Sequence, residues 1–319
     1  MKRKKVLVTG ASGFIGRNIF EVLSVRDELE VYGTYFSSEP EHKERFIQAD
    51  LRDRNTIFEI TRGMDMVIHA AAITSGAADI VSRPFIHVTD NAIMNTLICE
   101  AVHVQKVPHC VFLSCTVLYP MNTGYPVTEC DVDYSSIHDV YFGGAWMKIF
   151  GEKLCEFYSR MGNTRFTVIR HSNIYGPHDT YDISRAHMFA ATITKVMQAP
   201  EGGEIIVWGD GSERRDLVYV DDIIRFIETL TRTEHGPLEI INIGSGTAYA
   251  VREIVEKIVA ASEKNITIRY DASKPSLKTS LVLNVTKARK DFLWTPRVSL
   301  EEGIRKTMRW YEEEFGGAL

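Results

Sequence analysis

A glycine-rich turn near the N-terminus constrains this chain more than any other feature. The apolar run Val6–Thr9 leads directly into Gly-Ala-Ser-Gly-Phe-Ile-Gly, in which Gly10, Gly13 and Gly16 recur every third residue. The residues after the turn place Ile15 and other apolar side chains on one side of a helix. A buried strand, a glycine turn and a helix in this order predict the first unit of a parallel α/β sheet.

The same turn predicts a dinucleotide site. The first glycine permits a tight turn, the second lets backbone N–H groups approach a pyrophosphate, and the third allows the helix to pack closely on the strand. The residues that we expect to contact the cofactor in this turn are Gly10, Ser12, Gly13, Phe14, Ile15 and Gly16.

The phosphate state of the cofactor stays open. NAD-binding folds of this kind usually carry an acidic residue about 20 positions after the turn. Here the second strand ends in Gly-Thr-Tyr-Phe-Ser-Ser, and the first carboxylate is Glu39. Arg17, Ser37 and Ser38 are positioned to accommodate a 2′-phosphate, which favours NADP over NAD, although Arg17 also fits a solvated helix position.

Short apolar runs alternate with amphipathic stretches through the first 170 residues, which predicts a Rossmann-type, doubly wound parallel sheet. The strands that we expect are 6–9, 30–35, 46–49, 66–72, 109–114 and 166–170, with helices near 91–104 and 146–161. After Gly176 the rhythm is less regular, and we expect a smaller C-terminal lobe that includes a helix over 251–262 and a strand over 266–270. We therefore predict a dinucleotide-binding domain over 1–177 with a return segment at 217–246, and an interleaved substrate lobe over 178–216 and 247–319.

Composition excludes several classes of protein. The 37 basic and 42 acidic residues give a net charge of −5, which does not suit bulk binding to nucleic acid or to an anionic membrane. The five cysteines show no zinc spacing and no CxxC pair, so we expect reduced thiols, no metal and a cytoplasmic protein. No stretch approaches the roughly 18 apolar residues of a membrane span.

Further segments resemble the extended short-chain dehydrogenase/reductase family, which modifies nucleotide sugars. The similar segments are ADLRD, HAAA, SNIYGP and RRDLVYVDD, and they extend over nearly the whole chain. Within the family, YGPHD, IVWGDG, DASKP and EKLCE most resemble GDP-L-fucose synthase and related GDP-sugar enzymes.

The resemblance implies a role for residues outside the glycine turn. For the cofactor they are Asp50, Leu51, Ala70, Ala71, Ala72, Asn91 and Lys148, and for the substrate they are Asn173, His187, Trp208 and Arg215. The chain itself supports Arg215, because a guanidinium binds phosphate in a bidentate manner and Arg214-Arg215 follows a turn at the predicted lobe boundary. A surface pair that balances Asp216, Asp221 and Asp222 is the alternative.

The catalytic positions depart from the family. Its Tyr-x-x-x-Lys spacing sets a tyrosine and a lysine one turn apart on a helix, and here Lys148 matches the lysine whereas Gly144 occupies the tyrosine position. Tyr141 is seven residues from Lys148, about 10 Å along a continuous helix. Because Gly143-Gly144 is a poor helix interior, a bulge or a late helix start there would bring Tyr141 towards the nicotinamide. Tyr141 as an ordinary loop aromatic is the alternative.

The chain also differs from the family at the position where relatives carry a catalytic Ser or Thr hydroxyl. Counting back from Tyr119 places Cys115 where relatives have Ser or Thr, and Thr116 is the neighbouring candidate. A thiol can act as an acid or a base, depending on its pKa, or Cys115 can be a small buried residue. His187 resembles the histidine that partners an epimerising cysteine, whose own position here is Val117.

The sequence thus predicts an NAD(P)-dependent nucleotide-sugar oxidoreductase or epimerase. The leading hypothesis is C4 oxidation or reduction of a GDP-linked hexose or heptose, with or without epimerisation. The alternatives are a non-redox or transient-redox epimerase or dehydratase, and a catalytically impaired dinucleotide-binding regulatory subunit. The resemblance also implies a homodimer through helices 91–104 and 146–161.

Overall fold

A seven-stranded parallel sheet forms the centre of the protein. The structure is a computed structural model and describes residues 2–40, 44–74, 83–274 and 279–316. The strand order is β10-β6-β5-β4-β1-β2-β3, and every neighbouring pair is parallel. The strands are β1 (Lys4–Thr9), β2 (Leu29–Tyr35), β3 (Phe46–Gln48), β4 (Met66–His69), β5 (His109–Cys115), β6 (Arg165–His171) and β10 (Leu238–Ile243).

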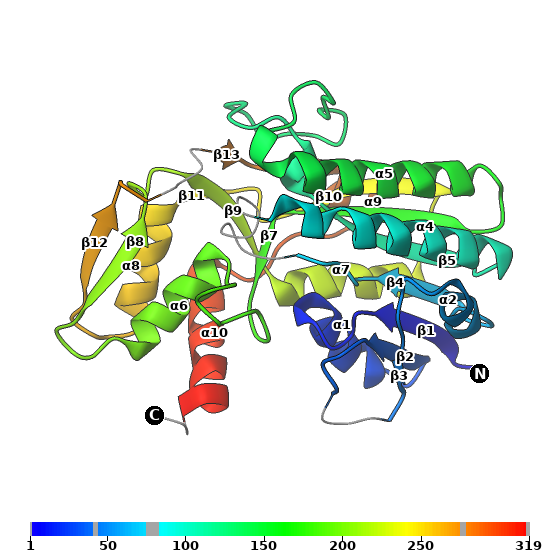
Figure 1. Cartoon of the computed structure of the whole chain (residues 1–319), viewed down its shortest axis with the longest axis horizontal. Coiled ribbons are helices and arrows are strands. Elements are labelled where there is room, and N and C mark those ends of the chain that lie inside the picture. The colour runs from blue at the N-terminus through cyan, green and yellow to red at the C-terminus, as the bar shows by residue number, and fades with distance from the viewer. Residues whose placement is uncertain (1, 41–43, 75–82, 275–278, 317–319) are drawn as a thin grey trace.

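Helices cover both faces of this sheet because its strands are apolar on both sides. In β1, Val6 and Val8 belong to one core cluster whereas Leu7, between them, belongs to the other. The first cluster includes side chains of α1 (Phe14–Ser24) and α7 (Val220–Arg232), and the second includes those of α2 (Arg54–Ile60), α4 (Thr89–Val104) and α5 (Phe142–Ser159). Figure 1 shows these two helical layers on either side of the strands.

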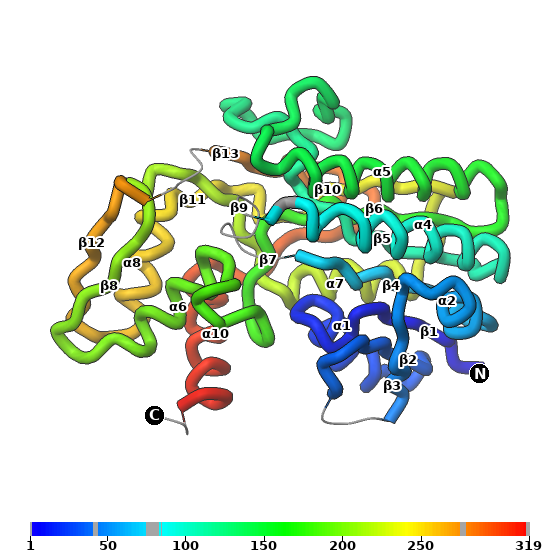
Figure 2. The backbone as a smooth tube through the Cα atoms, in the orientation of Figure 1, coloured from blue at the N-terminus to red at the C-terminus, as the bar shows by residue number. Residues whose placement is uncertain are grey.

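A second group of elements lies beside the large sheet (Figure 2). A four-stranded sheet contains β7 (Asn173–Tyr175), β9 (Arg214–Tyr219), β11 (Ala248–Ala250) and β13 (Ser280–Leu281), and a two-stranded sheet pairs β8 (Glu204–Trp208) with β12 (Thr267–Asp271). The helices here are α6 (Met188–Gln198), α8 (Val251–Ala261) and α10 (Leu300–Phe315), and α9 (Thr286–Phe292) packs near β10. Of segment 217–246, α7 and β10 lie with the large sheet, whereas β9 pairs within the smaller one.

The predicted doubly wound sheet is confirmed, but some element boundaries are wrong. The strand expected over 66–72 ends at His69, where the chain leaves the sheet. The helix expected from Trp146 begins at Phe142, so Gly143 and Gly144 lie in its first turn. The cost of a glycine in a helix is lost backbone entropy, roughly 0.5–1 kcal/mol relative to alanine, and helices in proteins gain most of their stability from tertiary packing. No late helix start therefore occurs, and Tyr141 precedes the helix at the end of the 3₁₀ turn η3 (Asp139–Tyr141).

None of the helices in the described part of the chain combines the length and the apolar character that crossing a membrane requires.

Candidate active site

The glycine turn is built for close contact with a ligand. Gly10 has φ +67°, a conformation that side chains other than glycine rarely adopt, and a Cβ there would lie 2.7 Å from Ala71 Cα. A Cβ at Gly16 would lie 2.2 Å from the Gly10 carbonyl oxygen, so the helix packs on the turn only because the side chain is absent. Helix α1 begins at Phe14, and its N-terminal N–H groups supply the positive potential that a pyrophosphate needs. The residues present fit a dinucleotide.

The segment expected at the adenosine end is held by charge pairs. Arg52 donates hydrogen bonds to both carboxylate oxygens of Asp50 and lies 3.1 Å from Asp90. Its guanidinium also lies over the ring of Phe36, 5.1 Å from the centroid, immediately after β2. Arg17, on the exposed side of α1, pairs with Glu21 at 2.8 Å. Leu51 is buried in the core beside this segment.

The strand end that follows β4 is fixed by a buried polar chain. The Thr9 hydroxyl lies 2.8 Å from His69 Nδ1, and His69 Nε2 lies 3.1 Å from Asn95 Oδ1. Burial lowers the pKa of His69 to about 4, so the ring is neutral. Asn91 accepts from Ile73 N and donates to Ile73 O, each at 2.9 Å, so its amide orders the loop beyond Ala70, Ala71 and Ala72. The structure thus gives Asn91 a positioning contact, and its predicted contact with cofactor stays a prediction.

Lys148 and Cys115 lie together at the carboxyl edge of the sheet. Lys148 Nζ donates to the Leu113 carbonyl oxygen at 2.7 Å, which points the buried ammonium at the end of β5. Burial lowers the pKa of Lys148, and the neighbouring Cys115 and Glu152 oppose that shift. Burial raises the pKa of the Cys115 thiol, and the Lys148 charge opposes it. Cys115 is therefore a protonated thiol next to a cation.

Gly144 leaves open space where the family has its tyrosine. A Cβ at Gly144 would meet no atom within 4 Å among the described residues. Tyr141 lies instead in a pocket with Thr116, Val117, Asn173 and Arg215. Burial raises the pKa of Tyr141, the Arg215 charge lowers it, and Cys115 adds a small upward influence. Tyr141 is thus close enough to both Arg215 and Cys115 for their charges to influence its pKa.

Arg215 is anchored at the far side of this pocket. Its Nη1 donates to Thr279 O at 2.9 Å and to Thr279 Oγ1 at 2.8 Å. Asn173 lines the same pocket and donates to Asp216 O at 3.0 Å. A guanidinium fixed in this way is preorganised for a phosphate oxygen.

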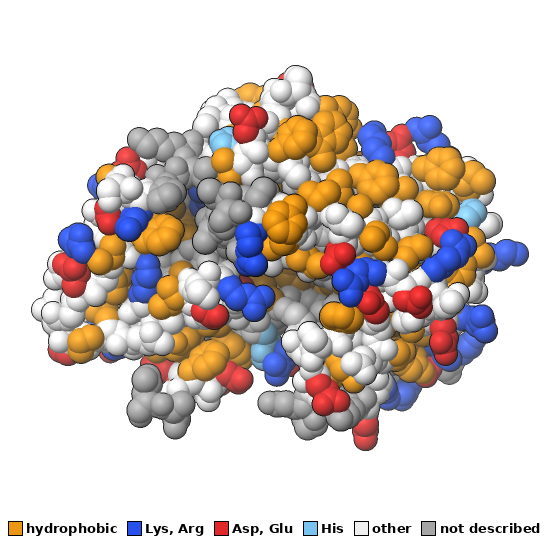
Figure 3. Space-filling view, in the orientation of Figure 1, with side chains coloured by type: hydrophobic (Ala, Val, Ile, Leu, Met, Phe, Trp, Pro, Cys, Tyr) orange, Lys and Arg blue, Asp and Glu red, His pale blue; other side chains and the backbone are white. Residues whose placement is uncertain are grey.

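Trp208 and His187 lie away from this pocket. Trp208 contributes to a second, open pocket with Ile183, Lys195 and Asp271, and its side chain is 49% exposed. His187 occupies the N-cap position of α6, where its exposed side chain makes no capping hydrogen bond, and the protein packed around it lowers its pKa. Figure 3 shows a hollow in the middle of one face of the molecule, with basic and apolar side chains at its rim.

His171 was not predicted. It pairs in register with Cys115 across β5 and β6, so the two residues lie side by side where both strands end. Its Nδ1 lies 2.8 Å from the Ser172 carbonyl oxygen, which can only accept, so Nδ1 carries the proton and Nε2 keeps its lone pair. Burial, with a smaller contribution from Lys148, lowers the pKa of His171 to about 4. Only the strand register identifies this neighbour.

All five cysteines are free thiols, and among the described residues no group of His, Cys, Asp and Glu side chains has the arrangement of a metal site. Cys99, Cys110 and Cys155 are buried in the core between the sheet and the helices α4 and α5, whereas Cys130 is exposed.

A parallel sheet with a glycine turn, a buried lysine at its carboxyl edge and a cationic pocket beside it defines a Rossmann-type dinucleotide-dependent enzyme. Residues 6–244 match the model of the NAD dependent epimerase/dehydratase family, and the chain belongs to that family. Its curated relatives include GDP-L-fucose synthase from Azorhizobium caulinodans, 27% identical over 97% of both chains. GDP-L-colitose synthase from Yersinia pseudotuberculosis is 29% identical over 97% of this chain and 98% of its own.

Solved structures share the fold over the whole chain. An epimerase from Methanothermobacter thermautotrophicus is 26% identical with a TM-score of 0.85, covering 99% of this chain and 94% of its own. UDP-glucose 4-epimerase from Thermotoga maritima, at 24% identity, has a TM-score of 0.85 and covers 98% of this chain and 99% of its own. The protein is thus an NAD(P)-dependent enzyme of the oxidoreductase and epimerase class.

Proposed function

We propose that the protein reduces or oxidises C4 of a hexose or heptose linked to GDP. The observation that carries the proposal is one pocket lined by Thr116, Tyr141 and the fixed guanidinium of Arg215. Cys115 immediately precedes Thr116, and Lys148 is close enough to Cys115 for its charge to act on the pKa of the thiol. A diphosphate at Arg215 puts the attached sugar towards Cys115. The GDP-sugar relatives support the nucleotide, and Asn173 and Trp208 are the further substrate contacts in this proposal.

In the reducing direction the chain supplies the proton. NAD(P)H, when bound, provides the hydride that reaches C4 of a 4-keto sugar. The Cys115 thiol transfers its proton to the sugar O4, which leaves an alcohol and a Cys115 thiolate. The Lys148 ammonium stabilises that thiolate and binds the nicotinamide ribose. Oxidation follows the reverse path, and the Thr116 and Tyr141 hydroxyls orient the sugar oxygen.

The test is NADPH oxidation in the presence of a GDP-linked 4-keto-6-deoxyhexose. We expect turnover by the natural chain and a loss of roughly 10²–10⁴-fold in Lys148→Met, because that variant removes the cation beside the reacting oxygen. Val25→Glu, on the exposed end of α1, is the matched control that keeps activity. Equal rates in Lys148→Met and the natural chain would overturn the proposal.

The cofactor in this proposal is NADP. No carboxylate follows β2 before Glu39, and Arg52 over Phe36 gives a cation near the predicted adenosine end, with Arg17 and Ser37 close in sequence to the turn and the strand end. We expect a lower KM for NADPH than for NADH. In Arg17→Ala the difference between these two KM values should become smaller. A preference for NADH in the natural chain reverses this assignment.

Epimerisation is the second candidate, and His187 favours it. The lowered pKa of His187 favours the neutral imidazole, which can exchange a proton with carbon beside a keto group. Solvent deuterium at C3 or C5 of the recovered sugar, lost in His187→Asn, is the expected sign. The third candidate, a regulatory subunit, rests on Gly144, and cofactor binding without any nucleotide-sugar binding is the result that would support it.

We also propose a homodimer through α4 and α5. Phe150 (38% exposed), Phe157 (57%) and Val104 (54%) lie on these helices, and Figure 3 shows apolar side chains gathered over them. An apolar surface of this kind typically marks an interface. Sedimentation of Phe150→Glu/Phe157→Glu is expected to show a monomer, while Val25→Glu stays dimeric. A monomeric natural chain would contradict the proposal.

A further inference from the structure

A buried carboxylate follows Lys148 by one turn of α5. Residues four apart on a helix lie on the same side of it, about 6 Å apart along the axis, so Glu152 lies on the side of α5 that carries Lys148. The Glu152 side chain is 6% exposed. It accepts a hydrogen bond from Ser114 Oγ on β5 at 2.5 Å and from Arg170 Nε on β6 at 3.0 Å. Glu152 therefore joins the helix of Lys148 to the carboxyl ends of both strands.

Stability alone is a weak reason for a charged pair at this place. Burial of a carboxylate and a guanidinium costs desolvation energy, and apolar residues of similar volume often leave a protein equally stable or more stable. The Glu152–Arg170 pair lies next to the candidate active site, because Ser114 and Arg170 immediately precede Cys115 and His171. Its place in the fold thus points to a role in the site.

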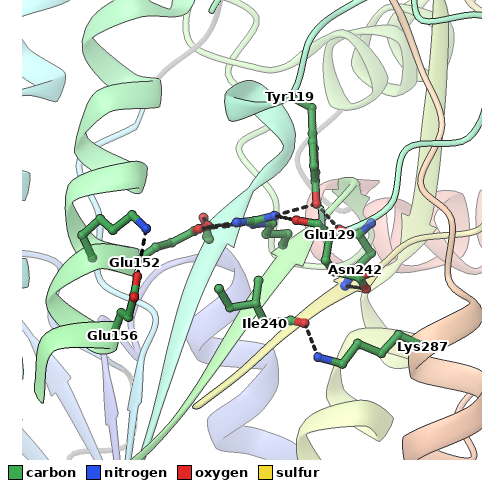
Figure 4. Close-up of polar contacts among 10 residues, drawn as sticks. Tyr119, Glu129, Glu152, Glu156, Ile240, Asn242 and Lys287 are labelled. Atoms are coloured by element: carbon green, nitrogen blue, oxygen red, sulfur yellow. Dashed lines mark hydrogen bonds and ion pairs between the residues drawn. The ribbon is translucent and has the colours of Figure 1, made fainter. Parts of the chain in front are cut away.

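The carboxylate of the pair acts on Lys148 more than the guanidinium does. Burial lowers the pKa of Lys148, and the Glu152 charge opposes that shift, whereas Arg170 makes no such contribution. The guanidinium also binds to a different part of the structure, because Arg170 Nη1 donates to the Tyr119 hydroxyl at 2.9 Å and to the Glu129 carbonyl oxygen at 2.8 Å (Figure 4). Arg170 therefore pairs with the carboxylate without cancelling its effect on the lysine.

The other titratable groups around the Lys148 ammonium are uncharged at neutral pH. Burial raises the pKa of the Cys115 thiol on β5, which keeps its proton. Burial lowers the pKa of His69 on β4 and of His171 on β6 to about 4, and the Lys148 charge adds to both shifts. Among the described residues, Glu152 is therefore the one ionised acid that acts on the Lys148 charge.

We propose that Glu152 is a positioning residue that keeps the proton on Lys148, so that the ammonium persists to higher pH than burial alone would allow. The inference rests on the proposed activity, in which that ammonium stabilises the Cys115 thiolate and binds the nicotinamide ribose. A neutral amine has no charge with which to stabilise a thiolate. Arg170 holds both carboxylate oxygens in place, at 3.0 Å from Nε and 2.6 Å from Nη2.

Titration of Lys148 by NMR tests the proposal. Lysine is labelled with ¹³C at Cε, and the Lys148 signal is assigned by its loss in Lys148→Met. Glu152→Gln/Arg170→Gln replaces the ion pair with two amides and leaves no unpaired buried charge, so this variant should fold. The Lys148 midpoint should fall by roughly one pH unit, because a nearby opposite charge has been removed. Glu156→Gln, which removes a surface carboxylate from the same helix, is the matched control and should keep the natural midpoint.

A single variant and an activity measurement complete the test. Glu152→Gln, with Arg170 kept, should lower the Lys148 midpoint at least as far as the double variant. In NADPH oxidation with the GDP-linked 4-keto-6-deoxyhexose, the ratio of the double variant's rate to the natural rate should fall about tenfold from neutral to alkaline pH. A role in packing alone would leave the Lys148 midpoint where it is, and that result overturns the inference. A lowered midpoint in a protein whose natural chain oxidises no NADPH keeps the effect of Glu152 on Lys148 and overturns the proposed activity.

Discussion

Glu152 and Arg170 form a buried ion pair next to the ends of β5 and β6, where Cys115 and His171 lie. Their Oε2 and Nη2 atoms are 2.6 Å apart, and each side chain is only 6% exposed. Ser114 also donates to Glu152 at 2.5 Å, and Arg170 donates to the Tyr119 hydroxyl at 2.9 Å. Figure 4 shows this network extending from Glu152 to Tyr119, Glu129 and Asn242. Because Ser114 and Arg170 immediately precede Cys115 and His171, the network fixes the ends of both strands.

Glu152→Ala should therefore destabilise the protein strongly. The change leaves the Arg170 guanidinium buried without its carboxylate, which costs about 3–5 kcal/mol. Urea unfolding measures the free-energy difference. Glu156→Ala on the same helix is the control, because Glu156 pairs with Lys153 and Arg160 at the surface, and such pairs contribute about 0–1 kcal/mol. Equal decreases in the free energy of unfolding in the two variants would show that the buried pair contributes no more to stability than a surface pair.

Two glycines on α5 should respond to alanine in opposite directions. Gly144 has open space around its Cβ position, whereas a Cβ at Gly151 would lie 2.4 Å from Phe112 Cζ. Gly144→Ala should stabilise the protein by up to about 1 kcal/mol, because alanine loses less backbone entropy in a helix. Gly151→Ala should destabilise it by about 1–3 kcal/mol through overpacking. Thermal unfolding of both variants makes the comparison, and a stabilising Gly151→Ala would contradict the packing described here.

Deprotonation of Cys115 should lower the rate of sugar reduction at alkaline pH. Burial raises the thiol pKa, so the proton that the sugar oxygen needs is present at neutral pH and is lost as the pH rises through that raised value. The kcat of the natural chain should fall at alkaline pH. Cys115→Ala should lose roughly 10²–10⁴-fold in kcat, while Cys130→Ala, at an exposed thiol, should keep the natural profile. An unchanged pH profile in Cys115→Ala would assign the proton to Thr116 or Tyr141 instead.

Asp179 should make the protein less stable as the pH rises. Burial raises its pKa to about 7, opposed only by a hydrogen bond from Thr180 N. Between the unfolded carboxyl value near pH ~4 and pH ~7 the native state holds a proton that the unfolded chain has lost, so the free energy of unfolding falls across this window. Asp179→Asn should add more than about 1 kcal/mol at pH ~8 and little at pH ~4. A gain of equal size at both values would rule out protonation as its source.

Residue types at fixed local spacing made the dinucleotide half predictable. The glycine spacing that a tight turn and a closely packed helix require lies within seven residues of sequence, although Gly10 also approaches Ala71 and donates its N–H to Thr34 Oγ1. Lys148 was singled out in the same way, because the residues after it on α5 keep the family pattern although Gly144 does not, and its role in the site stays a prediction.

The arrangement of Cys115, His171 and Tyr141 was less predictable, because it depends on contacts between segments that are distant in sequence. Cys115 and His171 are neighbours through the β5–β6 register, and Tyr141 and Arg215, which are far apart in sequence, line one pocket. The predicted start of α5 at Trp146 was wrong for a local reason. The free-energy cost of Gly143 and Gly144 was taken to be that of two glycines in a helix interior, whereas both lie in the first turn.

The alternation of the chain between its sheets sets a rule for engineering this enzyme. Strands β7 and β9 come before α7 and β10, and strands β11 and β13 come after them, yet all four belong to the small sheet. No single cut in the backbone separates that sheet from the large one. A chimera that exchanges sugar or base preference with a relative must therefore transplant two stretches at once, one on each side of α7 and β10. A transplant of either stretch alone would leave β9 with partners from two different parents.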